Sequence, residues 1–145
     1  MTTTLEEAQE LNLIARKKNL VLQVGHLERF NPAYLAIKQN VKSPLFIESH
    51  RLNSFQERGT EVDVILYIMI HDIAIILNLV DAAVTRIHAV GIPVISSMID
   101  IANARLEFEN GCVVNVTASR ISDKSMRKIR IFQQDAYISI DFAAQ

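Results

Sequence analysis

The sequence predicts an α+β fold, in which helices cover one face of a mainly antiparallel open sheet of about five or six strands. Three observations support this prediction. Residues 60–80 form a long apolar run with helical spacing, apolar and polar residues alternate along most of the chain beyond it, and residues 1–25 suggest one helix and one short strand. Alternation favours antiparallel strands, because such a sheet can bury one face and leave the other in water.

Composition and charge place the chain among single-domain globular proteins. It has 145 residues, of which 50% are hydrophobic, and its 4 glycines and 3 prolines argue against disorder. With 15 basic against 16 acidic residues and no basic tract, we expect no nucleic-acid partner and no membrane-surface patch. Cys112 is the only cysteine, which excludes an intramolecular disulfide and predicts an inert packing role. Without a signal peptide, the expected location is cytoplasmic.

The first 25 residues predict one helix and one strand. Thr3 or Thr4 can cap a helix that ends near Lys17. The apolar run at residues 20–24 predicts a strand with much of its surface buried. A parallel strand needs neighbours that one unit cannot supply, so we expect these residues to end an α/β domain whose earlier strands are missing.

A polar loop follows Gly25 and contains two candidate ligand-binding side chains, His26 and Arg29. Asn31 can cap the next helix, which is expected to run to about residue 39. A strand over residues 45–52 then carries a third candidate, Arg51. These side chains could bind an anionic or sugar ligand, and the alternative is that they are solvated surface residues.

The central helix, residues 60–80, is predicted to bury an apolar side and to carry a polar stripe opposite it. At about 100° per residue, the apolar side holds Val62, Leu66, Met69, Ile73, Ile76 and Val80. The stripe holds Asp63, Tyr67, His71, Ala74 and Asn78. A membrane span is not expected, because polar groups in the run are costly in hydrocarbon. His71 is either a satisfied core residue or a catalytic one.

Strands are predicted over residues 84–90, 102–109, 113–120, 127–133 and 136–142. Asn110 and Gly111 predict a hairpin with a type I′ turn between the second and third of these. The last two are expected to form another hairpin. No complete catalytic motif follows from these residues alone, since the chain contains no dinucleotide fingerprint, phosphate-binding loop or metalloprotease motif.

Several motifs together resemble those of the glucose-fructose oxidoreductase/inositol dehydrogenase/MocA family, over almost the whole chain. They are GHLERFNP at residues 25–32, MIHDI at residues 69–73 and DIANARLEFENG at residues 100–111. Within the family, the chain is most similar to the nucleotide-sugar dehydrogenase branch, which includes enzymes that oxidise UDP-N-acetylglucosamine.

The resemblance implies an NAD(P)-dependent enzyme with a Rossmann domain followed by an α/β domain for substrate binding and oligomerisation. On this basis residues 1–25 are a remnant of the dinucleotide-binding domain, and residues 26–145 are the second domain, cut at both ends. The family's glycine-rich fingerprint and EKP lysine would lie before Met1. We therefore expect this chain to bind no NAD(P) by itself.

The resemblance also implies site residues. His71 matches the family's acid/base histidine, which exchanges the proton of a substrate hydroxyl. The residues expected to contact substrate are His26, Arg29, Asn31, Arg51 and Tyr67. Tyr67 and Ala74 stand where relatives usually carry aspartates, so the negative charge expected beside His71 is missing at these positions. They indicate either drift in an inactive copy or deliberate alteration of an excised, engineered domain.

Two functions are therefore predicted. The first is a catalytically inactive module that binds or self-associates, most simply as a homodimer through the sheet face. The second is a partial oxidoreductase, in which a separate Rossmann domain complements this chain and His71 acts on a nucleotide sugar. A sugar ligand is compatible with either function.

Overall fold

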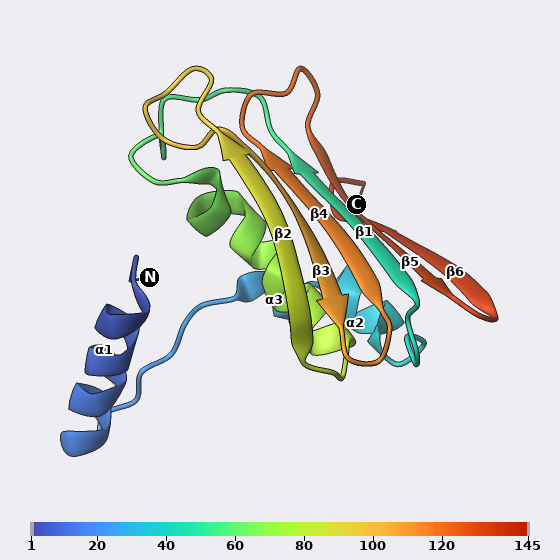
Figure 1. Ribbon diagram of the computed structural model, residues 1–145, viewed down its shortest axis with the longest axis horizontal. Helices are drawn as coiled ribbons and strands as arrows, with labels where there is room; N and C mark the ends of the chain where they lie inside the picture. The colour runs from blue at the N-terminus through green and yellow to red at the C-terminus, as the bar shows by residue number, and fades with distance from the viewer. Residues whose placement is uncertain (1, 145) are drawn as a thin grey trace.

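One six-stranded sheet organises the chain, and helices cover one of its faces (Figure 1). The computed structural model describes residues 2–144. Its elements are α1 (Leu5–Lys17), η1 (Leu27–Phe30), α2 (Pro32–Lys38), β1 (Phe46–Leu52), η2 (Ile65–Met69), α3 (Ile70–Leu79), β2 (Val84–Ile92), β3 (Ile101–Phe108), β4 (Val113–Ser119), β5 (Met126–Gln133) and β6 (Ala136–Asp141). This arrangement confirms the predicted α+β class.

The strands lie in the order β2-β3-β4-β1-β5-β6, and only the β1–β4 pair is parallel. Both predicted hairpins form, between β3 and β4 and between β5 and β6. The type I′ turn was wrong, because such a turn needs positive φ at both central residues and Asn110 does not adopt it. Instead Gly111, at φ +83°, closes a longer loop in which Asn110 Oδ1 accepts a hydrogen bond from Cys112 N at 3.0 Å.

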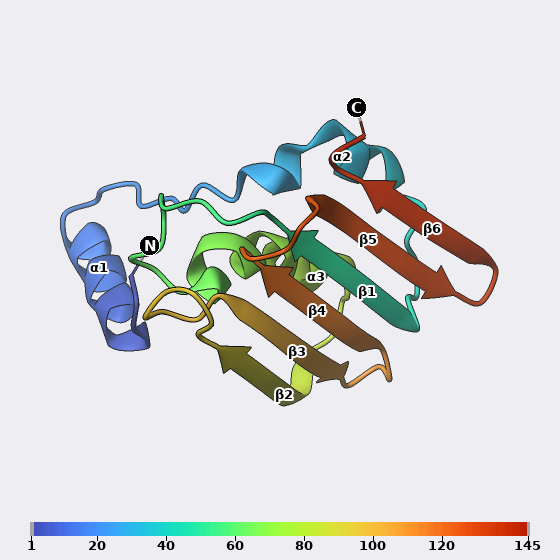
Figure 2. The same cartoon turned by 90° about the horizontal axis from the view of Figure 1, so that it is seen from above.

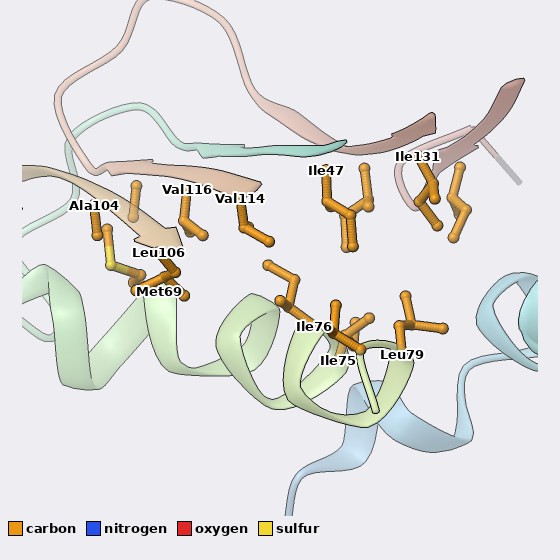
Figure 3. Packing of buried hydrophobic residues seen from close by; sticks show 14 of the residues in the cluster. Ile47, Met69, Ile75, Ile76, Leu79, Ala104, Leu106, Val114, Val116 and Ile131 are labelled. Carbon is orange, nitrogen blue, oxygen red and sulfur yellow. The ribbon is translucent and has the colours of Figure 1, made fainter. Parts of the chain in front are cut away.

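The hydrophobic core lies between α3 and the sheet (Figure 3). Ile75 and Ile76 of α3 are fully buried and point toward the strands. The sheet meets them with alternate residues of its central strands, including Ile47, Val114, Val116 and Ile131. Because successive side chains of a strand point to opposite faces, the same alternation leaves the other face uncovered (Figure 2).

The central helix differs from its prediction in two ways. It begins at Ile65 instead of residue 60, and its first turn is π-helical, with Ile70 N donating to Ile65 O. One additional residue in a turn rotates everything before it relative to α3, so a single helical period cannot describe the run. The buried residues of the run are consequently Val64, Ile68, Met69, Asp72, Ile75, Ile76, Leu79 and Val80. Of the predicted apolar side, Met69, Ile76 and Val80 are buried, whereas Val62, Leu66 and Ile73 are only partly buried. None of the helices within residues 2–144 has the length and apolar content needed to span a membrane.

The N-terminal segment contains the predicted helix but not the predicted strand. Thr4 and Glu7 form a reciprocal capping box at the start of α1, as the sequence indicated. Residues 20–24 form no strand, and Val21 is 94% exposed, so the buried strand was wrong. A strand needs a hydrogen-bonded neighbour, and no part of residues 2–144 pairs with this segment. In Figure 1, α1 stands apart from the sheet.

Candidate functional site

A polar cleft of about 260 Å³ lies beside the start of α3. It is lined by Glu28, Arg51, Asn53, Tyr67, Ile68, His71 and Arg127. These residues come from η1, the end of β1, the π-helical turn, α3 and the start of β5, so distant parts of the sequence meet here. Within residues 2–144 no group of three or more His, Cys, Asp or Glu side chains could hold a metal ion.

The π-helical turn places the two aromatic side chains of the cleft. Tyr67 lies inside this turn, and His71 is the second residue of α3, which follows the turn. Gly59, at φ +87°, packs under the Tyr67 ring so closely that a Cβ atom there would lie 2.7 Å from Cζ. Glycine is therefore required at this turn for both its backbone conformation and its lack of a side chain. π-Helical turns recur at functional sites, where they redirect side chains.

A buried ion-pair network forms the floor of the cleft. Arg51, only 4% exposed, donates from Nε to Asp72 Oδ1 at 2.7 Å, and its Nη1 donates to Glu28 Oε1 at 3.0 Å. Ser49 Oγ donates to the other oxygen of Asp72 at 2.6 Å. Buried charges persist in proteins when they are paired and hydrogen-bonded in this way. The network joins β1 to α3 and to the loop that carries Glu28.

The surroundings of His71 lower its pKa and so favour the neutral imidazole. Partial burial lowers its pKa, and the positive charge of Arg51 lowers it further, against the opposing influence of Glu28 and Asp72. Burial tends to raise the pKa of Glu28, but the hydrogen bond and charge of Arg51 outweigh burial and hold that pKa below its usual value. The negative charge near His71 therefore comes from Glu28 and Asp72, although Tyr67 stands where an aspartate was expected.

Two buried polar atoms of the cleft have no hydrogen-bond partner within the described part of the chain. They are Nη2 of Arg51 and Nδ1 of His71. Buried polar atoms are almost always paired in folded proteins, so an unpaired atom calls for an explanation, such as a ligand or an ordered water. The two atoms are a guanidinium donor and an imidazole nitrogen, and both belong to residues that line the same cleft. This combination suits a polar ligand.

The predicted site residues divide into two groups. His71, Arg51 and Tyr67 line the same cleft. The other three lie on the loop beside it. His26 is close enough for its charge to lower the pKa of His71. Arg29 is exposed, and its charge opposes the rise that burial causes in the pKa of Tyr34.

Asn31 has two local hydrogen bonds. Its Oδ1 accepts from Ala33 N at 3.0 Å, which confirms the predicted helix cap, and its Nδ2 donates to Glu28 Oε2 at 3.2 Å. Asn31 therefore helps to fix the orientation of the Glu28 carboxylate. Substrate contacts of the six predicted residues remain predictions.

Six cleft or network residues were missed in the sequence: Glu28, Ser49, Asn53, Ile68, Asp72 and Arg127. Glu28 lies between His26 and Arg29 in the same motif, and Asp72 follows His71, so proximity to predicted residues was an available signal. The direction in which their side chains point could not be predicted from the sequence, because it depends on the geometry of the loops and of the π-helical turn.

The residues present do not fit a dinucleotide cofactor. Such a cofactor needs a glycine-rich turn between a strand and the N-terminus of a helix. The four glycines, at positions 25, 59, 91 and 111, are isolated from each other, and residues 20–24 before the first are not a strand. The described residues therefore provide no cradle for a nicotinamide dinucleotide.

Comparison with known proteins gives one family. A family model described as the GFO/IDH/MocA C-terminal domain matches residues 39–139. UDP-N-acetylglucosamine 3-dehydrogenase of Acidithiobacillus ferrooxidans is 38% identical over 142 residues, which are 97% of this chain and 45% of that protein. The chain thus spans about half the length of the curated relative it matches.

Solved structures agree with this match. One crystal form of the Acidithiobacillus ferrooxidans dehydrogenase superposes with a TM-score of 0.89, covering 98% of this chain and 47% of that one. A dehydrogenase from Clostridium difficile, 25% identical, gives a TM-score of 0.80 over 97% of this chain and 46% of that one. A scyllo-inositol dehydrogenase from Lactobacillus casei, with bound NAD(H) and scyllo-inositol, is 18% identical with a TM-score of 0.70 over 89% of this chain and 44% of that one, and shows the fold alone.

Proposed function

The chain belongs to the GFO/IDH/MocA family, as a C-terminal domain, and on this premise we propose that it forms the substrate-binding half of an oxidoreductase that acts on a nucleotide sugar. His71 is the acid/base group of this half. The relative that supports the substrate class is a UDP-N-acetylglucosamine 3-dehydrogenase, which shares 38% of its residues with this chain over the aligned length.

The observation that carries the proposal is the pair of unpaired buried atoms, Arg51 Nη2 and His71 Nδ1, on one cleft. A sugar hydroxyl both donates and accepts hydrogen bonds, so it can donate to an imidazole nitrogen and accept from a guanidinium. Sugar hydroxyls would therefore supply each atom with the hydrogen-bond partner that it lacks. An apolar ligand would leave them unpaired at a cost of about 1–3 kcal/mol each.

The electrostatics favour His71 as a base. An imidazole whose pKa lies below its usual value is unprotonated at neutral pH and can accept a hydroxyl proton. Glu28 and Asp72 then stabilise the imidazolium that forms, because both carboxylates favour the protonated ring. Oxidation of the alcohol also needs a hydride acceptor, which the described residues are not built to hold, so this half is inactive unless a dinucleotide-binding domain complements it.

The proposal is tested by NMR titration of the chain with UDP-N-acetylglucosamine. We expect the His71 imidazole signals to move on binding, and His71→Gln to raise the Kd of the sugar ligand about tenfold, equivalent to one hydrogen bond to a polar group. His88→Gln is the matched control, because His88 is exposed on β2, outside the cleft. Equal affinities in the parent and His71→Gln would refute the proposal.

Activity gives an independent test. With NAD+ added, the chain alone should oxidise UDP-sugars no faster than His71→Gln, because residues 2–144 contain no glycine-rich turn that could hold the cofactor. A His71-dependent rate from the chain alone would contradict the proposal that a separate dinucleotide-binding domain is needed for activity.

A second role, self-association, is favoured by the uncovered face of the sheet. Phe46, Phe132 and Tyr137 lie on this face with ring centroids 5.8 and 5.0 Å apart along the row. Phe132 is 39% and Tyr137 58% exposed, and exposed aromatic side chains are enriched in protein interfaces. We propose a homodimer through this face, with Tyr67 facing the cleft instead of the contact.

We also propose that residues 1–25 belong to a dinucleotide-binding domain. Two observations support this: no residue of α1 is buried, and residues 20–24 are exposed although they have the apolar composition of an interior strand. Such a segment gains stability only when another sheet receives it. A cytoplasmic location remains a prediction that rests on cysteine usage.

A further inference from the structure

A second cavity, of about 400 Å³, adjoins the His71 cleft. Its lining is Asn53, Ser54, Gln56, Arg58, Tyr67, Ile68, Arg120, Ser125 and Arg127. Asn53, Tyr67, Ile68 and Arg127 line both spaces, so the cavity and the cleft are neighbours with Tyr67 between them. A long ligand bound at His71 would have this cavity beside it.

The cavity is strongly basic, yet one of its three arginines is already committed to the fold. Arg120 is 4% exposed and donates to Asp100 Oδ1 at 2.8 Å. Its remaining donors are taken by Ser96 Oγ and by backbone carbonyls of the neighbouring turns, those of Gly59, Val62 and Ile99. Arg120 is thus neutralised and has a structural role.

Arg58 and Arg127 are different. None of the ion pairs found within residues 2–144 involves either side chain. The described lining of the cavity also contains no aspartate or glutamate. Arg58 and Arg127 therefore offer two exposed guanidinium groups that form no ion pair within the described residues, and these complement a ligand with two negative charges.

The position of Arg127 strengthens the argument. It lies directly opposite Arg51 in the β1–β5 pair, so both side chains leave the sheet on the same face. Like charges in this position destabilise a sheet. The carboxylates of Asp72 and Glu28 compensate Arg51 but not Arg127. An anion bound between the cavity and the cleft would relieve the repulsion.

We propose that Arg58 and Arg127 bind the diphosphate of a nucleotide-diphosphate sugar whose sugar lies against His71. This inference rests on the proposed function and adds a location for the anionic part of the substrate. A diphosphate diester carries one negative charge on each phosphate, which matches the two free guanidinium groups, and a guanidinium binds phosphate through two parallel hydrogen bonds. Ser54 and Ser125 add hydroxyl donors to the same lining.

The test uses the intact chain, calorimetry, and UDP as the probe, with uridine as the uncharged comparison. We expect UDP to bind at least tenfold more tightly than uridine, and Arg58→Met and Arg127→Met each to weaken UDP about tenfold while leaving uridine unchanged. Arg86→Met is the matched control, because Arg86 is 65% exposed on β2 and has no place in the cavity. It should bind UDP as the parent does.

Arg127→Met removes one of two like charges, so it should fold at least as stably as the parent, and a thermal melt checks this. UDP affinity that is insensitive to both variants would overturn the proposal, as would equal affinities for UDP and uridine. NAD+ binding more tightly than UDP would assign the cavity to a dinucleotide and would also overturn it. Failure of the proposed function has a different signature, namely that UDP-N-acetylglucosamine binds no better than UDP.

Discussion

Replacing Arg51 by methionine should destabilise the chain severely, because this one side chain compensates two carboxylates. Arg51 and Asp72 are 4% and 2% exposed, and their Nε–Oδ1 distance is 2.7 Å. Methionine keeps most of the unbranched aliphatic part of the side chain, so the main loss is that of the guanidinium group. The remaining effect is electrostatic. Asp72 is left with a single hydrogen bond from Ser49, and Glu28 keeps only the one from Asn31.

Breaking a buried pair by removing one partner costs about 3–5 kcal/mol. For a chain of this size that loss corresponds to a fall in Tm of about 6–20 °C. The double variant Arg51→Met, Asp72→Asn should recover part of the loss, because asparagine requires no counter-charge. The matched control is Arg130→Met, which breaks the Glu48–Arg130 pair, also 2.7 Å long, but with side chains 34% and 31% exposed. Exposed pairs contribute little, so only a small fraction of the loss is expected.

Urea unfolding at pH 7, followed by circular dichroism, measures the parent, Arg51→Met, Asp72→Asn and the double variant, from which the coupling energy follows. The Arg130→Met control is measured in the same way. NMR titration of His71 gives a second readout. Removing Arg51 takes away a positive charge that lowers the His71 pKa and frees the Glu28 charge that raises it, so this pKa should increase. The reasoning is refuted if Arg51→Met costs no more than Arg130→Met, or if the His71 pKa falls.

Three further predictions concern acid stability, assembly and cofactor. Burial opposes ionisation of Asp100, but hydrogen bonds from Ser96 and the preceding backbone hold its pKa far below the unfolded value of about 3.9. The ionised Asp100 therefore stabilises the fold fully above about pH 3.9, and this stabilisation is lost as the pH falls below that value. Urea midpoints of the parent and Asp100→Asn should therefore converge in acid, and a gap that widens there would contradict this. Light scattering should give a dimer that Phe132→Lys dissociates and that Tyr67→Asp, Ala74→Asp leaves intact, whereas a monomeric parent would end the sheet-face proposal. Calorimetry should detect no NAD(H) or NADP(H) binding at sub-millimolar concentration, and a dissociation constant in the micromolar range would contradict this prediction.

Much of the architecture was predictable because its signals are local. A helix cap needs only residues two or three positions away, as with Thr4 and Glu7 or with Asn31 and Ala33. The hairpin at Gly111 follows from adjacent residues, although the form of its turn does not. Strand alternation also decided which residues of β3 and β4 would be buried, because the side-chain period of a strand is fixed by its backbone.

Part of the site was predictable and part was not. The motif around His71 indicated a candidate histidine, the strand predicted over residues 45–52 carried a candidate arginine, Arg51, and both line the cleft. No period or motif indicated that Asp72 faces inward, because a charged residue in an apolar run is normally assigned to the exposed side. Its burial depends on Ser49 and Arg51, which are more than twenty positions away in the sequence.

The sequence by itself determined the α+β class, the two hairpins, the helix caps and the residue types available for chemistry, since each follows from short-range backbone geometry and hydrophobic alternation. The tertiary structure decided which side of the central helix is buried, that residues 20–24 form no strand, and that Glu28, Arg51, His71 and Arg127 share one cleft. These outcomes share a physical cause. A π-helical turn changes the phase of a helix, a strand exists only with a neighbour, and a buried charge is stable only beside its partner, so each depends on contacts between segments that are distant in the sequence.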